Sequence, residues 1–456
     1  MSNSETYAER DVQFHFHAYT NARQHENCGP MIIERGEGIY VWDQSGKRYI
    51  EAMSGLWSVA VGFGEQRLVD AATKQMEKLP FYHNFTHRTH GPVIDLAEKL
   101  ISLAPVPMSK AFFTNSGSEA NDSLMKMIWY RSNALGLPLK KKLIARDRAY
   151  HGVTIGSGSL TGLPNNHRSF DLPIERVLRT GSPHYWRDAL PGETEEDFST
   201  RRARELEELI LAEGPDTIAA FFGEPVLGAG GIVPPPSGYW QKIQDVLNKY
   251  DILLVVDEVV CGFGRTGRMF GSETYNIRPD AMVLSKALSS SYLPISAILL
   301  NERFYAPIAD ETARVGTFGH GFTAGGHPVA AAVALESIRV IEDKGLIANA
   351  AAMGERLRAG LARFAEHELV GEVRGVGLIA AVELLPERLK QGKTLAPGQI
   401  GTMINTEMQK RGVIIRIMGD TVGFCPPLII DASAIDEIIE CFAASLNAVT
   451  AALNNE

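Results

Sequence analysis

Short apolar runs alternate with amphipathic stretches through the middle of the chain, from about residue 61 to residue 330. The runs are bounded by polar or glycine-containing turns and occupy residues 111–113, 143–145, 218–222, 252–256 and 281–284. Between two of them, residues 200–212 carry apolar side chains at helical spacing, which is typical of a surface helix. Strands that alternate with helices predict a mostly parallel sheet covered by helices, an α/β fold.

The two ends of the chain follow a different pattern. Near the start, residues 39–42 and 47–50 flank the turn sequence Asp43-Gln44-Ser45-Gly46 and predict a hairpin. Before the hairpin, we predict a helix that includes the Phe and His residues at 14–17. Towards the end, helix, strand, strand and helix patterns occupy in turn residues 328–343, 376–382, 412–416 and 432–453.

These patterns predict a division into domains. We predict an N-terminal arm with part of a small domain at residues 1–60, a large α/β domain at residues 61–330 and a small α+β domain at residues 331–456. The small domain would then be built from both ends of the chain.

The bulk properties are those of an ordinary globular protein. The 456 residues are 45% hydrophobic and 22% charged, which suits two or three domains with a large core. The formal net charge of -9 argues against binding to nucleic acid, which needs clustered Lys and Arg. A polar N-terminus and the lack of a long apolar run predict no membrane span. The four scattered cysteines fit a reducing compartment, so we expect a cytoplasmic protein.

Two of the apolar runs end in side chains that can do chemistry. The run at 281–284 stops at Ser285-Lys286, and the run at 252–256 stops at Asp257. Charges at the carboxyl ends of buried parallel strands lie where α/β folds bind their ligands. An amine and a carboxylate placed in this way suggest a carbonyl cofactor held as a Schiff base, with the carboxylate beside a ring nitrogen. Two ordinary strand-end charges would give the same pattern, so these two residues alone do not decide.

Further strand ends carry groups that suit a phosphorylated, aromatic ligand. Residues 114–121 place a Gly-Ser turn at the start of a helix, where backbone N–H groups bind phosphate, although plain helix capping gives the same pattern. Tyr150, followed by His151 and Gly152, can stack on a heteroaromatic ring or simply pack. Glu224 ends another buried run, and it either orients a bound group or pairs with a cation.

The order of these strand-end groups resembles the class III aminotransferases, which are pyridoxal 5'-phosphate enzymes of fold type I. The resemblance extends from about residue 40 to the last helix. Its specific elements are Asn115-Ser116-Gly117-Ser118-Glu119-Ala120, Tyr150-His151-Gly152, Asp257-Glu258-Val259, Gly262-Phe263-Gly264-Arg265-Thr266-Gly267, Ser285-Lys286 and Pro426-Pro427-Leu428. It implies the same two-domain α/β fold that the hydrophobic pattern predicts.

The resemblance also implies a role for each matched position. Lys286 would bond the cofactor as a Schiff base and carry the proton, Asp257 would keep the ring nitrogen protonated, and Tyr150 would be the third catalytic residue. Tyr150 would cover one face of the ring and Val259 the other. The remaining cofactor contacts would come from Ser116, Gly117 and Ser118 at the phosphate and from His151, Glu224 and Thr323.

The assembly is implied in the same way. Thr323 lies in the segment Gly321-Phe322-Thr323, which resembles the segment that reaches the phosphate of the neighbouring subunit. The resemblance therefore implies an obligate homodimer, and the sequence leaves open whether two dimers pair.

Two features resemble the branch that acts on ω-amino acids and amines with pyruvate. Residues 53–57 are similar to the arm of these enzymes, and Arg416 matches their mobile substrate arginine, with a surface ion pair as the alternative. One guanidinium can bind the carboxylate of a keto acid and then swing aside for an amine that lacks one. The substrate pocket would be formed by Leu56, Trp57, Phe85 and Arg416.

The chain departs from the family pattern in two places. Val260 stands where many ornithine- and GABA-type members have Gln, which favours pyruvate over 2-oxoglutarate as the acceptor. Residues 288–294, just after the lysine, contain no Gly, unlike the loop common there.

We therefore expect a ping-pong aminotransferase that moves an amino group from a primary amine or ω-amino acid to pyruvate. A pyridoxal-phosphate aminomutase or decarboxylase of the same fold is the first alternative, and a nucleotide-binding oxidoreductase is a remote one. We predict no metal site, because His83, His87 and His90 are bracketed by Pro and Gly and lack an acidic partner. The natural donor and the stereochemical preference are not encoded in any motif we can identify.

Overall fold

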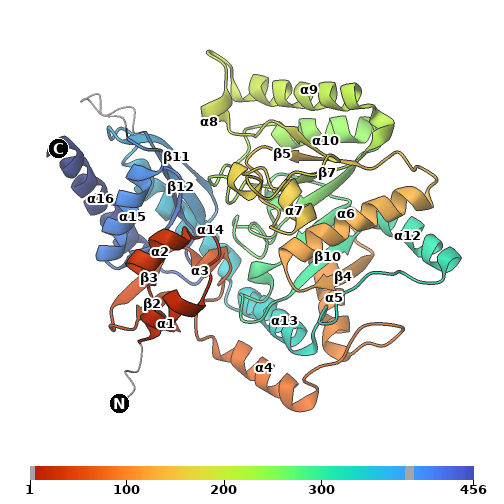
Figure 1. Cartoon of the computed structure of the whole chain (residues 1–456), viewed down its shortest axis with the longest axis horizontal. Helices are drawn as coiled ribbons and strands as arrows, with labels where there is room; N and C mark the ends of the chain where they lie inside the picture. The colour runs from red at the N-terminus through yellow and green to blue at the C-terminus, as the bar shows by residue number, and fades with distance from the viewer. Residues whose placement is uncertain (1–5, 386–394, 456) are drawn as a thin grey trace.

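The computed structural model describes residues 6–385 and 395–455. In these residues the strands form one seven-stranded sheet and two four-stranded sheets (Figure 1). The large sheet and its helices lie on one side of the molecule, and the two ends of the chain fold together on the other. None of the described helices is long and apolar enough to cross a membrane.

The strands of the large sheet are arranged so that most of their carboxyl ends meet at one edge. In order across the sheet they are β4 (Lys110–Thr114), β10 (Ser296–Leu300), β9 (Ala281–Leu284), β8 (Leu253–Asp257), β7 (Ile218–Gly223), β5 (Lys142–Arg146) and β6 (Val177–Thr180). Of these described strands, β10 alone is antiparallel to its neighbours. The prediction of a mostly parallel sheet is confirmed. The loops after β5, β7, β8 and β9 all lie at the same edge of the sheet, the edge where these strands end.

Helices cover both faces of this sheet because the strand residues alternate in direction. In β8, Leu253 and Val255 pack on the side of α6 and α12, whereas Leu254 and Val256 pack on the side of α9 and α10. The bounds of these helices are α6 (Gly117–Ala134), α9 (Glu195–Glu213), α10 (Tyr239–Lys249) and α12 (Glu302–Val315). Burial on both faces explains why the strand sequences are continuously apolar.

Both ends of the chain contribute to the smaller sheets. The C-terminal strand β13 pairs in parallel with β3, which belongs to the N-terminal hairpin. One sheet contains β1 (Ile33–Glu37), β2 (Tyr40–Asp43), β3 (Arg48–Glu51) and β13 (Val413–Ile414), and the other contains β11 (Val370–Val376), β12 (Ile379–Leu384), β15 (Thr421–Phe424) and β14 (Arg416–Met418). The helices that accompany them are α14 (Leu346–Ala362), α15 (Gln399–Lys410) and α16 (Ala432–Asn455).

The other helices of the described chain connect these parts. They are α1 (Tyr7–Phe14), α2 (Ala22–Cys28), α3 (Ser54–Trp57), α4 (Gln66–Lys78), α5 (Gly91–Leu103), α7 (Ile155–Leu160), α8 (Tyr185–Asp188), α11 (Gly271–Thr274) and α13 (Pro328–Asp343), with 3-10 turns η1 (Pro164–Asn166), η2 (Pro215–Thr217) and η3 (Lys286–Leu288). The predicted hairpin and the helices that begin at Pro328 and Ala432 are present.

Three predicted elements are wrong in detail. Residues 376–382 form parts of two strands, because Gly377, with φ of +50°, makes a turn inside the apolar run. Residues 412–416 divide between β13 and β14, which belong to different sheets. The helix predicted at 14–17 ends at Phe14, so His15 and His17 lie outside it. The domain boundaries near residues 60 and 330 stay a prediction.

Candidate active site

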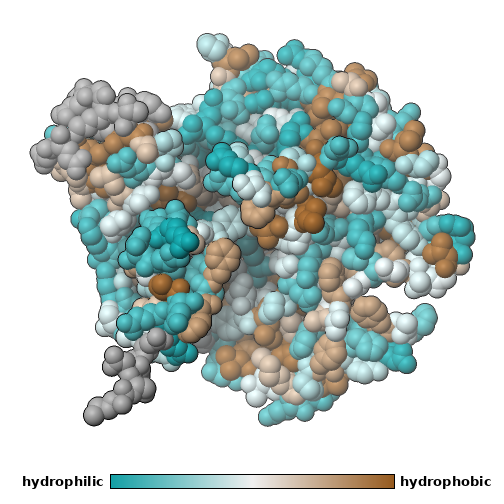
Figure 2. Space-filling model, in the orientation of Figure 1, coloured by the Kyte–Doolittle hydropathy of each residue, from teal (hydrophilic) through white to brown (hydrophobic). Residues whose placement is uncertain are grey.

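The amine and the carboxylates predicted to do chemistry meet at the carboxyl edge of the large sheet. Lys286 follows β9, Asp257 ends β8 and Glu224 follows β7, and these three strands are neighbours. All three residues line one cavity of about 1480 Å³. The face drawn in Figure 2 is hollowed near its centre, between the region of α1 to α3 and the region of α6 and α7. This edge of an α/β sheet is where such folds bind ligands.

Lys286 is held at the cavity in a strained backbone conformation. Its φ is +47°, in the left-handed region that residues other than glycine rarely adopt. Burial lowers the pKa of its amine, while Asp257 and Glu224 act in the opposite direction. The nitrogen lies 5.4 Å from the centre of the Trp57 ring, and it has no hydrogen-bonding partner among the residues that the structure describes. A buried amine that gives up its proton readily is suited to act as a nucleophile.

Hydrogen bonds to both oxygens fix the carboxylate of Asp257, which is only 4% exposed. Its Oδ2 accepts from Nδ1 of His151 at 2.9 Å and from Nδ2 of Asn121 at 3.0 Å. Its Oδ1 accepts from the backbone N–H of Val259 at 3.1 Å. Asn121 also donates to the carbonyl of His151 at 2.7 Å, so the loop, the helix and the strand hold one another in place. The negative charge therefore has a fixed position at the floor of the cavity.

The start of α6 gives the cavity a binding site for an anion. Ser116 is the N-cap residue, and its hydroxyl accepts from the backbone N–H of Glu119 at 3.2 Å. Ser116, Gly117 and Ser118 all line the cavity. The first-turn N–H groups of a helix have no partner within it, and the helix dipole favours a negative charge there. A side chain at Gly117 would press against Val259, so glycine keeps this end of the cavity open.

Glu224 fixes the loop that carries Tyr150. Its Oε1 accepts from the backbone N–H of Tyr150 at 3.0 Å, and its Oε2 accepts from that of Gly228 at 2.9 Å. Burial raises the pKa of Glu224, although His151 acts to lower it. Burial also raises the pKa of the Tyr150 hydroxyl. The loop after β5 is thus held against the loop after β7, and Tyr150, His151 and Glu224 all line the cavity.

Arg416 faces the same cavity without a carboxylate partner. It begins β14 and is half-buried, and within residues 6–385 and 395–455 it forms no salt bridge. The alternative of a surface ion pair is therefore wrong for this part of the chain. Leu56 and Trp57 of α3 also line the cavity, as do Val259 and Val260.

Two predicted site residues, Phe85 and Thr323, are absent from the cavity lining in the described structure. Phe85 is exposed, and a side-chain carbon added at Gly321 would lie 3.0 Å from its ring. Phe85 and the segment that contains Thr323 therefore share one region of the surface. The role of Thr323 in a neighbouring subunit stays a prediction.

The N-terminal arm contributes site residues that the sequence analysis missed. Ala18 and Tyr19 line the cavity. The Tyr19 hydroxyl accepts from Nδ2 of Asn166 and is hydrogen-bonded to Tyr150. No periodic pattern links the arm to the strand ends, so only the folded chain reveals the contact. Asn121 was also missed, although its position one helical turn after Gly117 places it on the same face of α6.

Comparison with known proteins identifies the family. A sequence profile of the family described as "Aminotransferase class-III" matches residues 20–446. The chain belongs to the class III aminotransferases. The remote alternative of a nucleotide-binding oxidoreductase is therefore wrong.

Relatives of this aminotransferase include enzymes from plants and bacteria. The mitochondrial gamma aminobutyrate transaminase 1 of Solanum lycopersicum is 49% identical over 429 residues, which are 94% of this chain and 83% of the relative. The ω-transaminase from Pseudomonas jessenii, solved in complex with PMP, is 58% identical with a TM-score of 0.97 over 99% of both chains. A thermostable ω-transaminase variant with a Trp, a Phe and an Arg replaced, engineered for the synthesis of bulky amines, is 57% identical with a TM-score of 0.97, over 98% of this chain and 100% of the variant.

Class III aminotransferases use pyridoxal 5'-phosphate, and the residues at this cavity fit that cofactor. The open start of α6 suits the phosphate, and the fixed carboxylate of Asp257 suits a protonated ring nitrogen. The amine of Lys286, which forms no hydrogen bond with the described residues, suits an aldehyde. The chain is therefore a pyridoxal-phosphate aminotransferase, as the sequence predicted.

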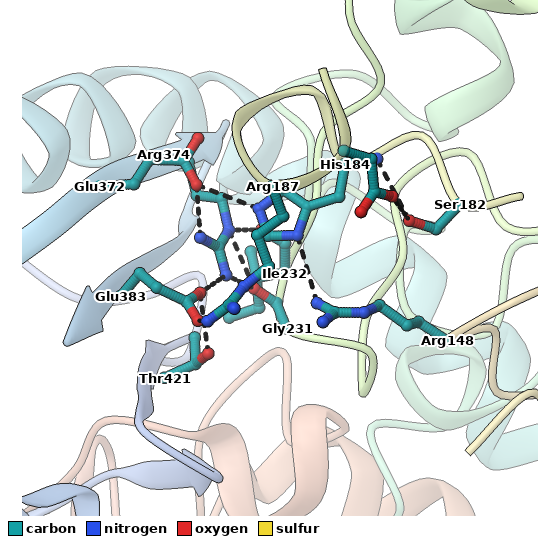
Figure 3. A network of polar contacts seen from close by, with 11 residues as sticks. Arg148, Ser182, His184, Arg187, Gly231, Ile232, Glu372, Arg374, Glu383 and Thr421 are labelled. Carbon is teal, nitrogen blue, oxygen red and sulfur yellow. Dashed lines mark hydrogen bonds and ion pairs between the residues drawn. The ribbon is translucent and has the colours of Figure 1, made fainter. Parts of the chain in front are cut away.

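A network of charged side chains joins the two parts of the aminotransferase beside the cavity (Figure 3). Arg374 of β11 lies at its centre, 2.5 Å from Oε2 of Glu383 and 2.6 Å from Oε2 of Glu372. Arg374 also donates to the backbone carbonyl of Gly231, in the loop after β7. Burial acts to raise the pKa of Glu383, but Arg374 and Arg187 lower it to about 2. Other members that Figure 3 labels are Arg148, Ser182, His184, Ile232 and Thr421.

Substitution of Arg374 by alanine is expected to destabilise the aminotransferase. The change leaves Glu372 and Glu383 partly or fully buried with too few positive partners, and breaking such a pair typically costs about 3–5 kcal/mol. Arg356→Ala is the matched control, because Arg356 pairs with Asp436 on the exposed surface and its loss should cost at most about 1 kcal/mol. The free energy of unfolding from denaturant titration measures both. Equal losses in the two variants would contradict the role assigned to Arg374.

Proposed function

We propose that this aminotransferase moves an amino group from a primary amine or an ω-amino acid to pyruvate. The observation that carries the proposal is the guanidinium of Arg416, which forms no salt bridge with the described residues and lies in the same cavity as the amine of Lys286. Arg148 and Arg187 also line the cavity, but they contact His184 and Glu383, so Arg416 is the guanidinium that we assign to the carboxylate of the acceptor. The same guanidinium can swing aside for donors that carry no carboxylate near the reacting carbon.

Two further features support this assignment. Leu56, Trp57 and Val260 give the cavity apolar walls. The ω-transaminase relative that was engineered for the synthesis of bulky amines carries changes at a Trp, a Phe and an Arg, and these are the residue types we assign to the pocket at Trp57, Phe85 and Arg416. The plant relatives are named for gamma aminobutyrate, which is an ω-amino acid.

The roles of the cavity residues follow from their chemistry. Bound here, pyridoxal 5'-phosphate supplies an aldehyde that captures amines and a ring that accepts electron density. Lys286, in its neutral form, would take the proton from the α-carbon of the donor. It would then give this proton to a carbon of the cofactor. Asp257 would hold a positive charge on the ring nitrogen, with His151 and Asn121 fixing its direction.

The remaining residues would position the cofactor. Ser116, Gly117 and Ser118 would hold the phosphate, and Tyr150 and Val259 would enclose the ring. Glu224 would keep the Tyr150 loop in place through the hydrogen bond described above.

We also propose a homodimer in which Phe85 and Thr323 complete the cavity of the neighbouring subunit. Neither residue lines the cavity of its own chain, Phe85 lies beside Gly321 in the segment that contains Thr323, and both residues are expected at an active site. Cytoplasmic location is proposed on the free thiols of Cys28, Cys261, Cys425 and Cys441, although relatives from plants carry mitochondrial and chloroplastic names.

A panel of donors against two acceptors tests the proposed reaction. With pyridoxal 5'-phosphate bound, the enzyme should convert aromatic amines and gamma aminobutyrate with pyruvate, releasing alanine, and should be much slower with 2-oxoglutarate. Carbon dioxide release, or an isomer of the donor as the product, would contradict it in favour of a decarboxylase or an aminomutase.

Substitution of Arg416 by alanine should separate the two substrates. Loss of a charge-assisted hydrogen bond of about 1.5–3 kcal/mol should raise the KM for pyruvate about 10- to 150-fold. The KM for an amine without a carboxylate should change little. Arg363→Ala, at an exposed ion pair with Glu440, is the control and should leave both values unchanged. A similar rise for both substrates would place Arg416 outside the acceptor site.

A further inference from the structure

Several imidazole rings surround one carboxylate in the N-terminal arm. Asp11 lies on α1, His15 and His17 follow that helix, and His25 lies on α2. Nδ1 of His15 lies 3.0 Å from Oδ1 of Asp11, and Nε2 of His17 lies 2.8 Å from Oδ2. Nε2 of His25 approaches Oδ2 at 2.9 Å. These residues, which we call the arm cluster, have no part in the amino transfer described above.

The arm cluster has the composition and access of a metal site. One ligand atom from each of Asp11, His15 and His17 lies within 4.8 Å of the other two. The His15 and His17 rings lie 4.2 Å apart, as do those of His17 and His25. The side chain of His15 is 65% exposed, so an ion can enter from solvent, whereas that of His25 is only 11% exposed. Imidazole and carboxylate together are the ligands that Zn²⁺ and similar ions prefer.

We propose that Asp11, His15 and His17 bind a divalent transition-metal ion such as Zn²⁺, with His25 as the group that orients Asp11. The ion would replace the protons that now lie between the rings and the carboxylate, so each ring would bind through the nitrogen that faces Asp11. His25 would keep its hydrogen bond to the carboxylate, the arrangement by which outer residues hold metal ligands in place.

The position of the arm cluster connects it to the active site. Ala18 and Tyr19 lie between His17 and His25 in the sequence, and both line the active-site cavity. The hydroxyl of Tyr19 contacts Asn166 on the far side. An ion bound at the arm cluster would therefore fix the segment between His17 and His25 at both of its ends. This segment contains Ala18 and Tyr19 and forms part of the cavity wall.

Binding of Zn²⁺ to the full-length, cofactor-loaded enzyme tests the proposal. After chelator treatment and its removal, calorimetric titration at neutral pH should give one saturable Zn²⁺ site per chain. His15→Ala/His17→Ala should lose this site, and His25→Gln should weaken it about 10- to 100-fold. Cys28→Ser and His87→Gln are controls for a nearby thiol and an exposed imidazole outside the cluster, and both should bind like the parent enzyme.

Limited proteolysis gives a second readout. The comparison of cutting rates with and without Zn²⁺ in the parent enzyme depends neither on activity nor on the folding of the double variant. Trypsin can cut after Arg10, which precedes Asp11, and after Arg23, which lies between His17 and His25. Zn²⁺ should slow both cuts in the parent enzyme and in Cys28→Ser, but not in His15→Ala/His17→Ala. Absence of a saturable site, retention of the site in the double variant, or equal cutting rates with and without Zn²⁺ would each overturn the proposal and leave the cluster as hydrogen bonds alone.

Discussion

Replacement of Lys286 by alanine is expected to lower the rate of amino transfer by at least about 10³-fold, because the variant loses both its nucleophile and the group that moves the proton. Burial lowers the pKa of this amine, which favours its neutral form, the form that can act as a base. Small amines added to the solution should restore part of the activity, since they can enter the cavity and take the place of the missing amine. Single-turnover measurements with one donor, with and without methylamine, would give both effects.

A chemical label separates this role from a structural one. Borohydride treatment of the cofactor-loaded parent enzyme should attach the cofactor to the peptide that contains Lys286, and Lys286→Ala should carry no label. Lys249→Ala, at an exposed ion pair with Glu207, is the control and should keep both label and activity. Turnover by Lys286→Ala without an added amine, or a parent enzyme labelled at another lysine, would make the assignment wrong.

The groups that carry the chemistry could be predicted from the sequence because the strand directly before each group determines its position. Lys286, Asp257 and Glu224 each follow an apolar run, and parallel pairing brings the ends of those runs to one edge without further information. The start of α6 was predictable for the same reason, since a Gly-Ser turn between a strand and a helix defines its own geometry. These groups all line the cavity.

The outer parts of the site could not be predicted in this way. Tyr19 reaches the cavity only because the arm folds across to the large sheet, a contact without any sequence pattern. The arm cluster was hidden for a related reason: helical spacing relates only His15, at i+4, to Asp11, whereas His17 lies past the end of α1 and His25 lies on α2. The turn at Gly377 was hidden because the residues on both sides of it, Val376 and the run from Leu378 to Val382, are apolar.

Replacement of Asp257 by asparagine should lower kcat by about 10²- to 10³-fold, although the side chain keeps its size. The amide carries no charge, so it cannot stabilise a positive ring nitrogen. It also cannot satisfy its surroundings, because both oxygens of Asp257 accept hydrogen bonds. Whichever way the amide is turned, its NH₂ group faces either the donors of His151 and Asn121 or the backbone N–H of Val259.

Steady-state kinetics at saturating cofactor would separate the loss in kcat from any loss in cofactor affinity. Asn121→Ala is the matched comparison, because it removes one donor to Asp257 and keeps the charge. It should cost about 1–2 kcal/mol, or roughly 5- to 30-fold, and should leave the pH dependence of kcat close to that of the parent. If Asn121→Ala reduced kcat as much as Asp257→Asn, the fixed position of the carboxylate would matter more than its charge. The role proposed for Asp257 would then have to be replaced by a purely structural one.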